Sequence, residues 1–276
     1  MKRHIQGWLV VALGLVLASA AVAYDYTNEP LPGSGINDTV HDLSTGANGL
    51  GAYVANPDDT LDRICIFCHT PHHSYKLSQA NGGPPAGLGS GNQAGDEFTY
   101  LPLWNHALTG NAGSYSMYYN GPGAPQVGKK ASQAVQQAVS GPGGVSLLCL
   151  SCHDGSVAVN EYGNSSQPAS SQSSGSGPIG AEYTIGKDNY LGNHHPIGFD
   201  YDAVSGADDE IEDADVASYG SAGDVRSHLY EDGNTRMECP TCHSVHNKGN
   251  EGERLLWISD NYSNLCLTCH LKGTKQ

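Results

Sequence analysis

The cysteines are the residues of this sequence whose spacing most clearly predicts a chemistry. All eight fall in four copies of the pattern C-x-x-C-H, and none is left over. The copies contribute the thiols of Cys65, Cys68, Cys149, Cys152, Cys239, Cys242, Cys266 and Cys269. Two thiols at this spacing can form thioethers with the two vinyl groups of one haem, and the histidine that follows then lies beneath the iron as its proximal ligand. The sequence therefore predicts four covalently bound haem c groups, whose irons are held by His69, His153, His243 and His270.

Two other uses of paired cysteines explain less of this pattern. Two zinc ribbons would need the C-x-x-C pairs but no histidine after each of them. Eight thiols in an exported chain could also form four disulfides, yet disulfides leave the four histidines unexplained as well. Haem attachment accounts for both residue types, so haem is the cofactor that we expect.

An internal repeat nominates the second histidine that each haem iron needs. The first and third motifs each carry a further histidine three residues after the proximal one, and each half of the chain has a histidine well upstream of its first motif. The order His, C-x-x-C-H-x-x-H, L-C-L-x-C-H thus occurs twice, as in a duplicated two-haem unit. The distal ligands nominated by this repeat are His41, His72, His195 and His246.

The reach of the chain limits which iron these histidines can serve. Three extended residues span at most about 10 Å, which is too short to pass around a haem edge from the proximal to the distal face. His72 therefore cannot complete the haem held by His69, nor can His246 complete the haem held by His243. We expect His72 and His246 to ligate the other haem of their own half. His106 is the reserve ligand, although a lone histidine is more often a hydrogen-bonded structural residue.

The ligand supply also bears on the kind of activity. Outside the signal sequence the chain has two methionines, Met117 and Met237, which are too few for four irons. Bis-histidine ligation, without the potential-raising methionine, predicts low reduction potentials. A multihaem reductase would need an iron with an open sixth position, whereas histidines are plentiful here. We therefore expect an electron carrier rather than an enzyme.

The N-terminus predicts export. Lys2 and Arg3 precede an apolar run over Trp8–Ala20, and Ala21–Ala23 has the small-x-small pattern that signal peptidase cleaves. The run is short for a membrane span, so residues 1–23 are interpreted as a signal peptide rather than as an uncleaved anchor, and no membrane span is expected in the mature chain. The protein is then extracellular or on the cell surface, or otherwise periplasmic.

The composition of the mature chain is poor in material for a protein core. The whole sequence has 36 Gly and only three Phe, so apolar haems would have to supply much of the interior. This predicts a mostly irregular, haem-cored fold with short α-helices and little β-structure. Acidic residues number 28 against 13 basic ones, which argues against nucleic acid and anionic membranes as partners and suits cations, basic proteins or mineral surfaces.

Local patterns predict how the elements and units are arranged. Short helices are expected over 61–68, 129–140, 146–153 and 264–271, most of them at the motifs. The Ser/Gly-rich segment 163–178 is the expected linker, which ends a first two-haem unit (24–178) and precedes a second (179–276). The acidic run 208–215 lacks the spacing of an EF-hand loop, so an exposed, solvated loop is preferred over a calcium site.

Several phrases around the motifs carry a family resemblance. They are His41-Asp-Leu-Ser, Cys65-Ile-Phe-Cys-His-Thr-Pro-His72, Pro102-Leu-Trp-Asn-His106, Leu148-Cys-Leu-Ser-Cys-His-Asp-Gly155, His195-Pro-Ile-Gly-Phe and Cys239-Pro-Thr-Cys-His-Ser-Val-His246. The chain resembles the multihaem cytochromes with doubled C-x-x-C-H motifs. With four motifs and a plain signal peptide, it is similar to the extracellular tetrahaem cytochromes that polymerise into conductive filaments.

This resemblance implies bis-histidine haems, a continuous haem chain and an axial ligand donated across the subunit interface. The expected partners are copies of the same chain joined head to tail, other redox cytochromes and extracellular acceptors such as metal oxides. His41, in a Gly/Asn-rich N-terminal segment, is the candidate donor across the joint, and the alternative is that it folds back onto a haem of its own half. A soluble periplasmic electron shuttle is the alternative function.

Overall fold

The computed structural model describes the part of the chain that carries all four motifs. The residues described are 31–44, 54–55, 61–72, 76–78, 98–100, 103–109, 111, 115–118, 131–162, 179–181, 183–231, 233–250 and 253–273. The predicted signal peptide 1–23 and the predicted linker 163–178 lie outside them.

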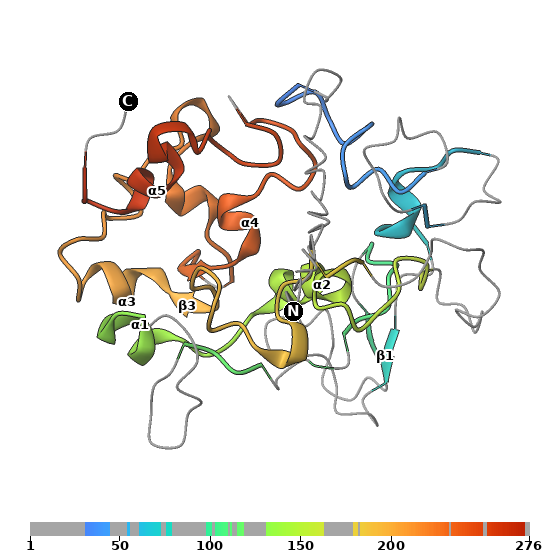
Figure 1. Ribbon diagram of the computed structural model, residues 1–276, viewed down its shortest axis with the longest axis horizontal. Coiled ribbons are helices and arrows are strands. Elements are labelled where there is room, and N and C mark those ends of the chain that lie inside the picture. Colours follow the sequence, from blue (N-terminus) through green and yellow to red (C-terminus); the bar gives the residue numbers. More distant parts are fainter. Residues whose placement is uncertain are drawn as a thin grey trace, which may run out of the picture.

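Regular structure is sparse and consists of short pieces (Figure 1). The α-helices are α1 (Gln133–Ala138), α2 (Gly144–His153), α3 (Tyr201–Ser205), α4 (Cys239–Cys242) and α5 (Asn264–Cys269). The 3-10 helices are η2 (Cys65–Phe67), η5 (Lys187–Asn189), η6 (Gly220–Ala222), η7 (Val225–His228) and η8 (Asn261–Ser263). Two antiparallel pairs join strand β1 (Lys76–Ser78) to β2 (Phe98–Tyr100) and β3 (Phe199–Asp200) to β4 (Arg236–Met237). The prediction of an irregular chain with short helices and little β-structure is confirmed.

The expected helices form, but the first two are shorter than the sequence suggested. At the first motif only η2 forms, because Asp62 has a left-handed backbone (φ 50°) that interrupts a helix beginning at residue 61. The helix expected over 129–140 begins only after Ser132, whose side chain accepts a hydrogen bond from the Val135 amide at 3.3 Å and caps α1. The helices at the second and fourth motifs, α2 and α5, lie where they were expected.

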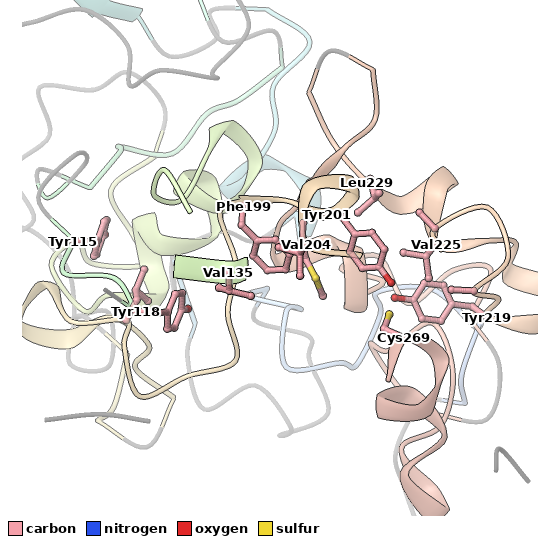
Figure 2. Close-up of a cluster of buried hydrophobic side chains, with 14 of the residues drawn as sticks. Tyr115, Tyr118, Val135, Phe199, Tyr201, Val204, Tyr219, Val225, Leu229 and Cys269 are labelled. Carbon is pink, nitrogen blue, oxygen red and sulfur yellow. The ribbon is translucent and has the colours of Figure 1, made fainter. Parts of the chain in front are cut away.

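The main apolar cluster draws on both halves of the chain. Figure 2 shows buried side chains that run from Tyr115 and Tyr118 through Phe199 and Tyr201 to Tyr219. A second cluster near the first motif is much smaller and centres on Trp104, with Cys68, Leu108 and Leu148 packed against it. Since the main cluster crosses the expected boundary at residue 178, the two predicted haem units share one core; the boundary itself stays a prediction.

The acidic run 208–215 lies at the surface and forms ion pairs. Arg226 contacts both oxygens of Asp215 (3.0 and 3.1 Å) and also Asp202 (2.9 Å), and Lys272 pairs with Glu210. Among the described residues, no group of three or more His, Cys, Asp or Glu side chains is placed to hold a metal ion. No helix in the described part of the chain is long and apolar enough to cross a membrane.

Candidate functional site

Each C-x-x-C-H motif lies on a helical turn. The first motif begins in η2, the second ends α2, the third forms α4 and the fourth ends α5. In three of the motifs the amide of the motif histidine donates to the carbonyl of the first motif cysteine, over 2.7 Å for His69, 3.3 Å for His243 and 2.9 Å for His270. One helical turn brings residues i, i+3 and i+4 to the same side. Both thiols and the imidazole of a motif can therefore address one haem.

All eight cysteines are free thiols in this structure. Burial raises the pKa of Cys68 to about 11 and the pKa of Cys152 and of Cys242 to about 12, so these thiols are protonated at neutral pH. The four disulfides considered as an alternative use of the cysteines are not formed. The donor set at each motif thus fits thioether attachment.

The motifs follow one another in space in the order of the sequence. Cys68 of the first motif is close enough to raise the pKa of Cys152 in the second. Cys149 of the second motif interacts with the thiol of Cys239 in the third. The third and fourth motifs meet in the same way, because Cys269 raises the pKa of Cys242. Haems attached at these motifs would form a consecutive series.

Three proximal histidines each face a second histidine that is remote in sequence. The distances between ring centres are 6.0 Å for His69 and His246, 6.1 Å for His153 and His41, and 6.2 Å for His270 and His195. An iron that binds two imidazole nitrogens at about 2 Å each would hold the ring centres roughly 6 Å apart. The spacing of all three pairs therefore fits bis-histidine ligation of a haem iron between the rings.

Backbone carbonyls orient several of these rings through Nδ1. Nδ1 of His41 lies 3.4 Å from the Val245 carbonyl. Nδ1 of His153 lies 3.1 Å from the Tyr183 carbonyl, and Nδ1 of His195 lies 2.9 Å from the Pro196 carbonyl. When Nδ1–H donates to such a carbonyl, the lone pair on Nε2 is left for iron. Burial, reinforced by the neighbouring His153, lowers the pKa of His41 to about 4, which keeps its imidazole neutral.

One of these pairings differs from what the sequence suggested. His246 was expected to serve the other haem of its own half, but its ring faces His69 of the first motif. His41 was the candidate donor to another subunit, with a haem of its own half as the alternative, and its ring faces His153 of its own half, in agreement with that alternative. His195 faces His270 at the equivalent position of the second half.

The fourth nominated ligand, His72, lies outside these pairs. Its side chain is exposed, and so is that of His243, whose Nδ1 lies 3.3 Å from the Leu255 carbonyl. Among the described residues, neither His72 nor His243 forms an imidazole pair of the kind that the three pairs above make. The reserve ligand His106 is buried, and its two ring nitrogens lie 2.8 Å from the Ala107 carbonyl and 3.0 Å from the Ala158 carbonyl. This arrangement suits a structural histidine.

The sequence interpretation missed a carboxylate directly behind the second motif. Asp154 is buried and accepts hydrogen bonds from the Tyr115 hydroxyl (2.7 Å), the Asn111 amide (3.0 Å), Thr109 and Ser156. Although burial alone would raise it, these bonds hold the pKa of Asp154 below its ordinary value. Asp154 thereby holds Thr109, Asn111 and Tyr115 against the C-terminal end of α2. The Asp next to the motif histidine was the available signal.

A second missed residue, Glu238, joins the helices of the second and third motifs. Its carboxylate is buried and accepts the Gly143 amide at the start of α2 over 3.1 and 3.2 Å, and Arg236 pairs with it at 3.1 Å. In return, the Ser146 hydroxyl of α2 accepts the Cys239 amide at the start of α4 (2.9 Å). These reciprocal bonds set the separation of α2 and α4, and with it that of the second and third haem positions.

Replacing Glu238 by alanine is expected to destabilise the fold by about 3 kcal/mol or more, because the change leaves Arg236 and the Gly143 amide without their buried partner. Guanidinium unfolding, followed by circular dichroism, measures the change. Glu231→Ala is the matched control, since Glu231 also contacts Arg236 (3.1 Å) but is partly exposed. Its cost is expected to stay below about 1 kcal/mol. Equal losses in the two variants would contradict the assignment.

Comparison with known proteins agrees with this site. Residues 233–275, which hold the third and fourth motifs, match the family model described as the doubled CXXCH motif. The match supports a multihaem c-type cytochrome, with covalently bound haem c and a role in electron transfer. A comparison with curated protein sequences finds no match.

Proposed function

We propose that this chain is a tetrahaem c-type cytochrome that carries electrons outside the cell and polymerises head to tail into a filament with a continuous chain of haems. The observation that carries the proposal is the set of three imidazole pairs with ring centres 6.0 to 6.2 Å apart, each of which joins a motif histidine to a remote one. Iron held between two such imidazoles has no open position for a substrate, which suits electron transfer rather than catalysis.

The close succession of the motifs supports conduction along the chain. Bound haem would supply the redox chemistry, by alternating between ferric and ferrous iron. The protein residues keep the haems near one another and hold the imidazole pairs in place. The contacts between the second and third motifs, made by Glu238 and Ser146, are one such support.

The joint between subunits is proposed to use His72 and His243. Both side chains are exposed, one is a proximal ligand at the third haem, and the other is the nominated distal ligand that faces none of the described motif histidines. A bond from His72 of one subunit to the haem iron held by His243 of the next would complete the fourth pair and join the haem chains. The resemblance to filament-forming cytochromes supports a donated ligand of this kind, and the acidic surface suits contact with extracellular cations and minerals.

All four ferric irons of the native secreted protein are expected to be low-spin, because each would have two imidazole ligands. Haem quantitation together with EPR and optical spectra measures this, and negative-stain microscopy of the secreted fraction shows whether filaments are present. A substantial high-spin signal or a Met–iron band would contradict bis-histidine ligation. Low-spin haems in a protein that stays monomeric would instead identify a soluble shuttle.

A further inference from the structure

One short segment after the third motif touches three haem positions. His243 is the predicted proximal ligand of the third haem, and His246 faces His69 of the first motif. Between them, the Val245 carbonyl lies 3.4 Å from Nδ1 of His41, which faces His153 at the second. The side chain that ends this segment, Asn247, is fully buried.

Asn247 binds the N-terminal segment 31–44 to this loop. Its side-chain amide donates to the carbonyls of Leu31 and Gly35 (3.0 Å each), and its backbone carbonyl accepts the Gly35 amide at 2.9 Å. Its side-chain oxygen accepts from the Leu255 amide (3.2 Å) and from the Asn250 side chain (2.9 Å). Figure 1 shows the segment in blue at the top of the view, next to the orange-red loop that follows α4.

The N-terminal segment is itself ordered between this anchor and His41. Thr39 is buried and donates to the Ile36 carbonyl (2.7 Å), while its hydroxyl oxygen accepts the His41 amide (3.2 Å). Asp42, also buried, accepts from the amides of Asp38 (2.9 Å) and Ser44 (3.1 Å). Local hydrogen bonds therefore order the chain from Ile36 through His41 to Ser44, directly after the residues that Asn247 binds.

We propose that Asn247 is a positioning residue for the sixth ligand of the second haem: it docks segment 31–44 so that His41 reaches the iron held by His153. This assignment rests on the bis-histidine ligation proposed above. It makes ligation at the second haem depend on a residue that lies beyond the third motif and touches no haem ligand by its side chain.

Asn247→Asp tests the proposal with little change in shape. The backbone at residue 247 is left-handed (φ 47), a conformation that Asp tolerates as Asn does. The variant replaces the amide donor by an oxygen that faces the Leu31 and Gly35 carbonyls. One haem in four is expected to become high-spin and to bind carbon monoxide when reduced, with the same spectrum as His41→Ala. Added imidazole should restore the low-spin form.

A second variant approaches the contact from its other side. Gly35→Pro removes the amide that donates to Asn247 and cannot adopt the positive φ of 106 at that position. It is expected to give the same single high-spin haem while leaving residues 243–247 unchanged. Asn105→Asp is the matched control for turning a buried amide into a carboxylate: Asn105 donates to the Ile66 carbonyl of the first motif (2.5 Å), so any high-spin haem that it causes is expected at the first motif and not at the second.

The outcomes separate this proposal from the proposed ligation. If the wild type is fully low-spin and both variants remain so, Asn247 does not position the ligand, and bis-histidine ligation stands. If the variants resemble His246→Ala rather than His41→Ala, the residue acts on the first haem and the proposal is wrong. A wild type that already has a high-spin second haem would overturn the ligation by His41 itself.

Discussion

A variant that lacks both thiols of the first motif, Cys65→Ala/Cys68→Ala, is expected to lose the ordered structure around that motif as well as one haem. The reason is the small amount of apolar packing among the described residues there, where the cluster beside the first motif consists of Trp104 with partly buried neighbours. A haem retained by thioethers would supply the missing apolar surface, and burial of such surface contributes about 25 cal/mol per Å². Limited proteolysis with mass spectrometry should show early cleavage within residues 61–72 and 103–109.

The fourth motif provides the control for this experiment. Cys266→Ala/Cys269→Ala also removes one haem, but Cys269 belongs to the main apolar cluster, which includes Tyr201, Tyr219 and Val225 and retains most of its side chains without it. The C-terminal half of this variant is therefore expected to stay resistant to protease. If both double variants were cleaved equally early, haem would not replace a protein core at the first motif in the way proposed.

The sequence predicted the local features of this protein well because they depend on residues close together in the chain. The helical turns at the second and fourth motifs follow from Ser146–His153 and Asn264–Leu271, and the structure has α2 and α5 there. The shortage of large apolar residues and the abundance of Gly predicted an irregular fold with little β-structure, which is confirmed.

The partners of the distal histidines were beyond the reach of such reasoning. Spacing excludes a bond from His246 to the haem of His243, but it does not identify which other motif lies nearby. That choice depends on the contact of the loop after the third motif with the first motif, and on the docking of segment 31–44 by Asn247. An isolated Asn after a histidine carries no pattern that would mark it, and the bonds of Glu238 to α2 are equally non-local.

Replacing His72 by alanine is expected to convert the proposed filament into monomers in which one haem in four is high-spin. His72 is proposed to complete the haem held by His243 of the neighbouring subunit, so its loss removes both a sixth ligand and the bond across the joint. A heterologous contact of this kind propagates into a polymer, and a metal–ligand bond makes it far harder to dissociate than a polar interface alone. Size-exclusion chromatography, negative-stain microscopy and EPR on the same preparation measure the two effects together.

The neighbouring histidine serves as the matched control, because His73→Ala removes an imidazole from the adjacent position and is expected to leave polymer and spectra unchanged. Filaments of His72→Ala that retain four low-spin haems would show that His72 is not a ligand. Filaments that persist with one high-spin haem would place the His72–iron bond inside a single subunit. In that case the joint must rest on surface contacts, since His41, His195 and His246 already face motif histidines of their own chain.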